Sequence, residues 1–308
     1  MIEEFSFISS TGKEIYARKW MNKSVSEYKG VVQLVHGMEE HIGRYDEFAN
    51  FLANNGFIVV GHDHLGHGKT AKTEEELGYF TEEKGWFYLA EDIHILQNKI
   101  KKEYPEIPYI IMGHSMGSLL TRTYATLYQD EVDGIIITGT SGQKTGLLTG
   151  KLLAKFIMLC KGKKYKSKLL ASLVTGSFNR QFKPNKTSVD WTTSDEKVIE
   201  EHIKDTNPNC KFTVSAYYEL FTGSMYLNKK KNIAKTPNVP ILIFSGDKDP
   251  VGEKGKGVVR VYQMLKKTGK DDVTLKLFPN GRHEMLNEVN REEVFAFVLD
   301  WITSKIEK

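Results

Sequence analysis

The chain has 308 residues and a mass of 35.1 kDa, which fits one α/β domain carrying an insertion. Hydrophobic residues make up 40% and charged residues 27% of the chain, an ordinary globular composition that folds without disulfides or metals. The formal net charge of +4 is too small to indicate a nucleic-acid-binding protein. With only Cys160 and Cys210, an acidic N-terminal segment and no apolar run near the ~18 residues that cross a bilayer, we expect a soluble, cytoplasmic protein with reduced thiols.

Alternation of apolar and polar side chains over 4–9 and 13–20, around Ser10-Thr11-Gly12, predicts an N-terminal β-hairpin. Beyond it, short and almost continuously apolar runs alternate with segments of helical periodicity. The apolar runs cover 30–36, 57–63, 108–114, 132–139, 239–246 and 273–278. The helical segments cover 45–53, 87–100, 119–128, 258–267 and 294–306. Apolar strands that alternate with helices predict an α/β fold with a mostly parallel central sheet and helices on both faces.

This alternation stops near residue 143 and resumes near residue 236. The stretch between shows helical patterns at 147–161, 197–204 and 213–220 and no convincing strand, and it is far longer than a normal loop. We therefore predict a catalytic domain made of residues 1–143 and 236–308 and a helical cap, or lid, made of residues 144–235. The cap has 18 Lys or Arg against 7 Asp or Glu, a net charge of +11, which leaves −7 for the rest of the chain.

The sharpest local signal is Gly113-His114-Ser115-Met116-Gly117, a Gly-x-Ser-x-Gly motif. It follows one apolar run and opens a helical segment, which is the setting of a nucleophile elbow. Side chains in place of the two glycines would collide with neighbouring backbone. Ser115 is therefore the candidate nucleophile, presented at the carboxyl edge of the sheet beside the positive end of a helix.

A serine needs a base to take its proton and a third group to orient that base. Only two histidines follow Ser115, and His202 falls in the cap, before the last two predicted strands. His283 lies in a glycine-containing loop directly after the final strand, so it is the predicted base. The loop after 239–246 offers Asp247 and Asp249 as the acid. We expect Asp249 to reach the histidine and Asp247 to bind turn amides.

The tetrahedral intermediate of acyl transfer needs two preorganised N–H donors. The backbone N–H of Met116, next to the nucleophile, is the first candidate. The second is Met38, in the loop His36-Gly37-Met38-Glu39-Glu40-His41 that follows the strand at 30–36. In the glycine-rich form of this loop a second glycine stands where this chain has Glu39.

With these motifs the chain resembles the α/β-hydrolases of the monoglyceride lipase and lysophospholipase group over nearly its full length. The resemblance rests on His36 to His41 followed by Arg44-Tyr45, on 61–68 (GHDHLGHG), on the serine elbow, on Asp249, on 282–285 (RHEM) and, in the cap, on Asp190-Trp191 and 194–196 (SDE). It implies a cofactor-free and metal-free carboxylic ester hydrolase with a lid over a hydrophobic acyl pocket. The implied substrates are monoacylglycerols, lysophospholipids or similar acyl esters. Esterases acting on small or aromatic esters and peptidases share the pattern.

Three alternatives compete with a serine hydrolase. His62, His64 and His67 with Asp63 could begin a dinuclear metal site, although the further Asp-His pair expected beside such a motif is missing. A ligand-binding protein on the same fold is disfavoured by an intact nucleophile, acid and base. A nucleic-acid role for the basic cap is disfavoured because its lysines alternate with leucines and no base-reading motif is present.

The segment at 147–161 offers a clue to the substrate. On a helical wheel its apolar residues occupy about half of the circumference: Leu148, Leu152, Leu153, Phe156, Ile157, Leu159 and Cys160. Lysines lie on the other side and continue to Lys168. One interpretation is a lid helix packed on the catalytic domain with solvated lysines. The other is an apolar face that lines an acyl pocket while the lysines contact an anionic membrane surface.

Overall fold

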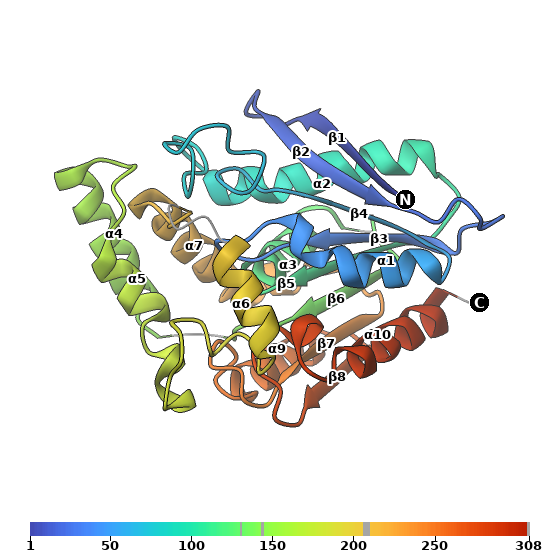
Figure 1. The fold of residues 1–308 in the computed structure, drawn as a ribbon. Helices are drawn as coiled ribbons and strands as arrows, with labels where there is room; N and C mark the ends of the chain where they lie inside the picture. Colours follow the sequence, from blue (N-terminus) through green and yellow to red (C-terminus); the bar gives the residue numbers. More distant parts are fainter. Residues whose placement is uncertain (130, 143–144, 206–209, 307–308) are drawn as a thin grey trace.

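The computed structural model describes residues 1–129, 131–142, 145–205 and 210–306. Its centre is an eight-stranded sheet in the order β1-β2-β4-β3-β5-β6-β7-β8 (Figure 1). The strands are β1 (Ile2–Ile8), β2 (Glu14–Trp20), β3 (Gly30–Val35), β4 (Phe57–His62), β5 (Tyr109–His114), β6 (Gly134–Thr138), β7 (Ile241–Gly246) and β8 (Val273–Phe278). The first two form the predicted antiparallel hairpin, β2 also runs antiparallel to β4, and the pairs from β4 to β8 are parallel. The prediction of a mostly parallel sheet is confirmed.

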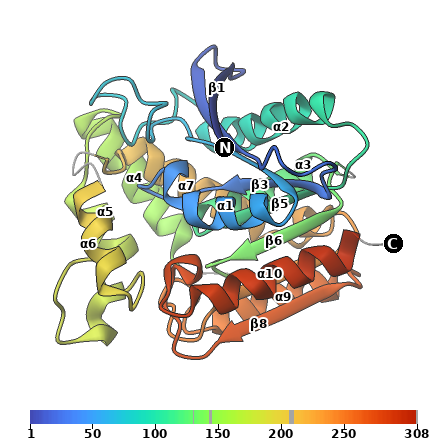
Figure 2. The same ribbon diagram turned by 45° about the vertical axis from the view of Figure 1, so that its right-hand side comes forward.

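Helices cover both faces of this sheet, as predicted. On one face lie α1 (Asp46–Asn54) and α10 (Arg291–Ile306), which run beside each other in Figure 2. On the other lie α2 (Gly85–Glu103), α3 (Met116–Leu127) and α9 (Lys256–Lys267). Side chains of a strand alternate between two apolar cores: Val31 and Val35 of β3 belong to the core under α2 and α3, Val32 and Leu34 to the core under α1 and α10. A strand buried on both sides is almost entirely apolar, which is why its sequence showed no alternation; in β3 only Gln33 is polar.

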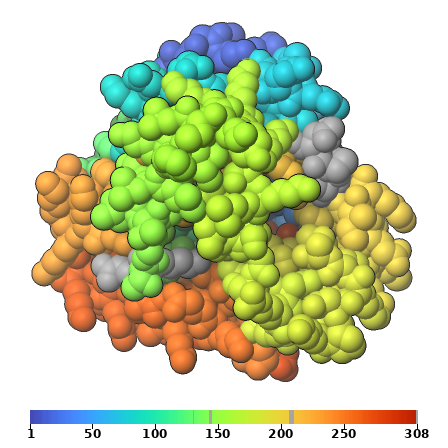
Figure 3. Space-filling model, turned by 90° about the vertical axis from the view of Figure 1, so that its left-hand side faces the viewer, coloured from blue at the N-terminus to red at the C-terminus, as the bar shows by residue number. Residues whose placement is uncertain are grey.

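The chain between β6 and β7 forms α4 (Leu147–Lys161), α5 (Lys168–Thr175), α6 (Glu196–Asp205), α7 (Val214–Leu227) and α8 (Lys230–Ile233). Its described residues contain no strand, and α5 and α8 were not predicted. The helix α7 packs against α2, α3 and α4, whereas α4 to α6 lie beyond the carboxyl ends of the parallel strands (Figure 1). Figure 3 views that end, where the yellow-green residues around α4 and α5 cover much of the face. No helix in the described part of the chain is long and apolar enough to span a membrane.

Candidate active site

Ser115 lies in a sharp turn between β5 and α3, with φ of 53° and ψ of −119°. This region is unfavourable for a residue with a Cβ, and such strain concentrates at functional sites. The flanking glycines make the turn possible by their lack of side chains. A Cβ on Gly113 would come within 2.3 Å of the Gly117 carbonyl oxygen, and one on Gly117 within 2.0 Å of the Val35 carbonyl oxygen. The predicted role of both glycines is confirmed.

His283 and Asp249 meet in the buried interior at the carboxyl edge of the sheet. His283 Nδ1 lies 3.0 Å from Asp249 Oδ1, and both side chains are almost fully buried. Burial by itself lowers the pKa of His283, but the adjacent Asp249 carboxylate outweighs it, so the pKa lies above the usual value. Burial would raise the pKa of Asp249, but His283 and hydrogen bonds from Ser245 Oγ and the Val251 N–H lower it. The pair is thus an imidazole oriented by a carboxylate, and each group favours the charged form of the other.

Asp247, the other candidate acid, has a different role. Its Oδ1 accepts a hydrogen bond from the Asn280 N–H at 2.8 Å. This contact ties the loop after β7 to the turn after β8, which carries His283 three residues later. The expectation that Asp247 binds a turn amide is confirmed, and no contact joins it to His283 in the described structure.

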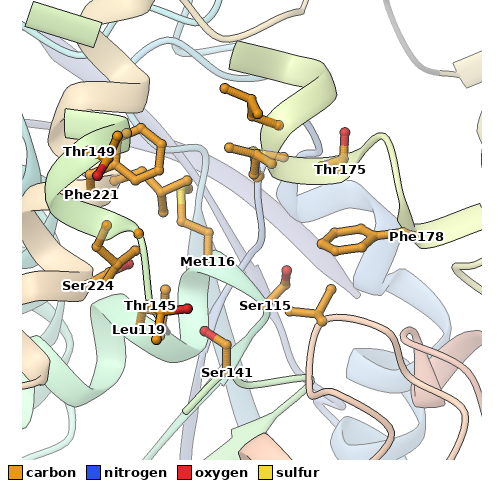
Figure 4. A pocket seen from close by; sticks show the side chains of 18 of the residues that line it. Ser115, Met116, Leu119, Ser141, Thr145, Thr149, Thr175, Phe178, Phe221 and Ser224 are labelled. Carbon is orange, nitrogen blue, oxygen red and sulfur yellow. The ribbon is translucent and has the colours of Figure 1, made fainter. Parts of the chain in front are cut away.

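Ser115, Met38 and Met116 line one cavity of about 510 Å³. Figure 4 shows Ser115 at its wall between Ser141 and Phe178, with Met116 beside it. The loop with Met38 passes close to the serine, since a Cβ on Gly37 would lie 3.1 Å from Ser115 Cβ. Apart from a few hydroxyls, the rest of the lining is apolar and includes Leu119, Leu153, Leu173, Val174, Leu220 and Phe221. We call this the apolar cavity.

A second cavity, of about 210 Å³, shares Ser115, Met38, Thr175 and Trp191 with the first. His283 lines it on one side. Most of the remaining lining is charged or hydroxylic and includes Glu39, Glu40, Arg44, Thr192, Lys211 and Glu284. We call this the polar cavity. Ser115 therefore stands where an apolar and a polar space meet.

A buried ion group beside the polar cavity was not predicted from the sequence. Arg44 lies 2.8 Å from Glu284 and 3.1 Å from Glu40, and all three side chains are less than a tenth exposed. Burial would raise the pKa of Glu284, but Arg44 holds it well below the usual range, so the carboxylate stays ionised. Glu40 also accepts hydrogen bonds from the Gly37 N–H and the Tyr45 hydroxyl. The spacing of four residues between Glu40 and Arg44 was the only available sequence signal.

Two aromatic contacts of His283 were also missed. The Trp191 ring lies against the imidazole with centroids 5.0 Å apart, and the His114 ring lies at 4.7 Å. Burial and then the nearby His283 lower the pKa of His114 to about 4, so it is neutral at neutral pH. The backbone N–H of Trp191 donates a hydrogen bond to Asn179 Oδ1 at 2.9 Å. The His283 imidazole is therefore packed against rings from two separate segments.

The histidine-rich loop after β4 has structural contacts. The Asp63 carboxylate accepts hydrogen bonds from the N–H groups of Ile42 and Lys69, both at 2.7 Å, as expected for a tight loop. No cluster of three or more His, Cys, Asp or Glu side chains in the described ranges is arranged to hold a metal ion. Burial lowers the pKa values of the three histidines, to about 3 for His62, to about 4 for His67 and well below the usual value for His64.

The apolar residues of α4 divide between two environments. Leu153 lines the apolar cavity, together with Leu147 and Gly150. A second row faces solvent: Leu148, Leu152, Phe156 and Leu159 are 57–79% exposed. The interpretation of the α4 apolar face as the lining of a pocket is therefore right for only part of that face. The rest of the face is exposed to solvent.

The strained serine elbow at the carboxyl edge of a mostly parallel sheet defines an α/β-hydrolase. Residues 26–290 match the family model described as serine aminopeptidase, S33, and the chain belongs to this family. It is 26% identical to a monoacylglycerol lipase of Mycolicibacterium smegmatis over 98% of both chains, and 23% identical to human monoglyceride lipase over 97% of this chain and 89% of that one. A thermostable carboxyl esterase from Bacillus coagulans, solved in complex with glycerol, is 30% identical with a TM-score of 0.92 over 99% of both chains. The chain is a carboxylic ester hydrolase similar to monoglyceride lipases.

Proposed function

We propose that the chain hydrolyses monoacylglycerols through an acyl-enzyme on Ser115, with His283 as base and Asp249 as the acid that orients it. One observation carries the proposal: Ser115 lies at the junction of a large apolar cavity and a smaller polar one. An ester with a long acyl chain and a small polyol divides into parts that match the two cavities. The names of the relatives, monoacylglycerol lipases and a carboxyl esterase with bound glycerol, support the same substrate class.

In the first half of the proposed reaction, Ser115 Oγ attacks the ester carbonyl while His283 Nε2 takes its proton. Asp249 holds Nδ1–H and stabilises the imidazolium that forms. The N–H groups of Met38 and Met116 bind the oxyanion. When the tetrahedral intermediate collapses, the C–O bond breaks and the alcohol leaves with the proton from His283.

In the second half a water molecule attacks the acyl-enzyme and transfers a proton to His283. The new tetrahedral intermediate collapses to release the fatty acid and return the proton to Ser115 Oγ. The glycerol must first leave the polar cavity to make room for water. Apart from this water, the proposed steps use side chains and backbone groups of the chain.

The charges around the polar cavity favour a neutral polyol over a phosphate ester. Arg44 is shared between two carboxylates, and Lys211 lies 2.9 Å from Glu39. Each Lys or Arg in the described lining is thus already paired, and the carboxylates outnumber the cations. Carboxylate oxygens accept hydrogen bonds from hydroxyls and repel a phosphodiester. We therefore place lysophospholipids second to monoacylglycerols.

We further propose that residues 144–235 form a cap that contacts an anionic lipid surface. Support comes from the exposed row of Leu148, Leu152, Phe156 and Leu159 beside the lysines of the same segment. Apolar side chains flanked by cations suit the boundary between headgroups and acyl chains. Added salt should then slow hydrolysis of monoacylglycerol in anionic vesicles and leave the turnover of a soluble ester unchanged. An equal salt response for both substrates would refute the contact.

The substrate proposal is tested by comparing kcat/KM for a monoacylglycerol and a lysophosphatidylglycerol of the same acyl chain below their critical micelle concentrations. We expect kcat/KM to be at least about tenfold higher for the monoacylglycerol. Moving a phosphate from water into a cavity without a free cation costs more than about 1.4 kcal/mol, which corresponds to a factor of ten. A series of p-nitrophenyl esters then measures the acyl preference, expected to rise by up to about fourfold per methylene, or 0.8 kcal/mol. Preference for acetyl over longer chains would indicate an esterase for small esters, and turnover of aminoacyl amides alone a peptidase.

A further inference from the structure

Glu39 occupies an unusual position in the loop that carries Met38. Its φ is 59°, in the left-handed region that glycine adopts most easily. The backbone N–H of Glu39 donates to His67 Nε2 at 3.3 Å. The loop therefore adopts the turn without the expected glycine, and an additional contact must hold it there.

The carboxylate of Glu39 supplies that contact by reaching out of its own loop. Oε1 accepts a hydrogen bond from the Phe212 N–H at 2.9 Å, and Oε2 lies 2.9 Å from Lys211 Nζ. Only 14% of the Glu39 side chain is exposed, so these charge-assisted bonds are partly shielded from water. The oxyanion loop is thereby fastened to the residues that precede α7.

The segment that Glu39 binds is itself joined to the turn between α4 and α5. The Val214 N–H donates to the Tyr165 carbonyl oxygen at 2.8 Å, and the Ser215 N–H to that of Lys163 at 3.2 Å. On its other side, the Thr213 N–H donates to the Gly78 carbonyl oxygen at 2.9 Å. A continuous set of hydrogen bonds thus runs from the α4–α5 turn, through residues 212–215, to the loop beside Ser115.

We propose that Glu39 is a positioning residue that holds the Met38 N–H in place as an oxyanion donor and links it to the cap. This proposal rests on the proposed function, because it assigns Met38 to the oxyanion hole. A glycine would adopt this left-handed conformation without strain. Glu39 is instead held in it by the bonds of its carboxylate to Lys211 and Phe212, just before α7. Loss of the carboxylate should therefore weaken binding of the transition state more than binding of the substrate.

The test compares E39G, E39A and E39Q with wild type on a soluble p-nitrophenyl ester, with kcat normalised to active sites titrated by a fluorophosphonate. Deleting one oxyanion donor costs about 10²–10³ in kcat, so misplacing it in E39G and E39A should cost about 10–100-fold. KM should change less than about threefold. E39Q retains an acceptor for the Phe212 N–H, and its loss should stay below about fivefold. A trifluoromethyl ketone, which forms an oxyanion with the serine, should lose affinity in E39G by the same factor as kcat.

E82A is the matched control, because Glu82 pairs with Lys163 of the same α4–α5 turn at 2.6 Å and does not touch the oxyanion loop. Its kcat should equal that of wild type. If E39G kept the wild-type kcat and ketone affinity, the proposal would be overturned. The left-handed backbone conformation alone would then position the Met38 N–H, without the Glu39 carboxylate. Equal losses in E82A and E39G would also overturn it. If S115A retained activity, the proposed function itself would fail, a result that the Glu39 variants cannot produce.

Discussion

Replacing Asp249 with asparagine tests the pairing that shifts the pKa of His283, the proposed base. Asp249 Oδ1 faces both His283 Nδ1 and the Val251 N–H, while Oδ2 accepts from Ser245 Oγ. An asparagine with its carbonyl oxygen in the Oδ1 position keeps these contacts, because Ser245 Oγ can accept from its amide. The substitution therefore removes mainly the negative charge. Unit charges about 4 Å apart at an effective dielectric of 20 interact by about 4 kcal/mol, so kcat should fall about 10³-fold.

D247N provides the control, since Asp247 lies two residues away and binds only the turn at Asn280 in the described structure. Its kcat should stay within about threefold of wild type. Steady-state turnover of p-nitrophenyl butyrate by both variants, with circular dichroism melting curves to verify folding, gives the comparison. A loss in D247N as large as that in D249N, or a D249N enzyme with wild-type kcat, would refute the reasoning.

Three further predictions follow from the same site. The proposed base is the neutral form of His283, so kcat/KM should fall as the pH drops. Because the pKa of His283 is raised, this acid limb of the pH profile should lie above pH 6.5, the usual histidine value. W191L should move that limb to lower pH by about 0.4 to 1.5 units, because the indole lies against the imidazolium and such contacts contribute about 0.5–2 kcal/mol. An unmoved limb would leave Trp191 a purely steric role. R44M leaves Glu40 and Glu284 buried without their cation and should lower the free energy of unfolding in urea by about 3–5 kcal/mol, whereas a loss below 1 kcal/mol would contradict the buried ion group.

Local sequence patterns predicted most of the catalytic domain, because each buried strand and its following helix leave a distinct signature. Ser115 could be predicted as the nucleophile because the glycines on both sides are required by close backbone contacts. His283 and Asp249 could be assigned because the carboxyl ends of parallel strands meet at one edge. These predictions depended only on the order of the residues along the chain and on the topology of the sheet. They did not require knowledge of how side chains pack.

The contacts that the sequence did not reveal join residues far apart in the chain. Arg44 meets Glu284 across 240 positions, and Glu39 meets Phe212 across 173. Nothing local distinguishes these carboxylates from those of a solvated loop. Trp191 lies in a segment with no regular pattern, so its position against His283 follows only from how the chain between α5 and α6 folds. The wheel of α4 identified apolar residues, but which of them line the cavity depends on how α4 packs against α7.

Acid-quench mass spectrometry tests most directly whether Ser115 is the nucleophile. The enzyme is mixed with excess p-nitrophenyl butyrate, stopped in acid within the first turnovers and digested, and the peptide carrying the acyl group is sequenced. We expect a butyryl group, a mass increase of about 70 Da, on Ser115 alone, with none in S115A and less in H283A, because acylation also needs His283 as its base. Turnover of the ester by S115A at the wild-type rate, or butyrylation of another residue with Ser115 unmodified, would contradict it.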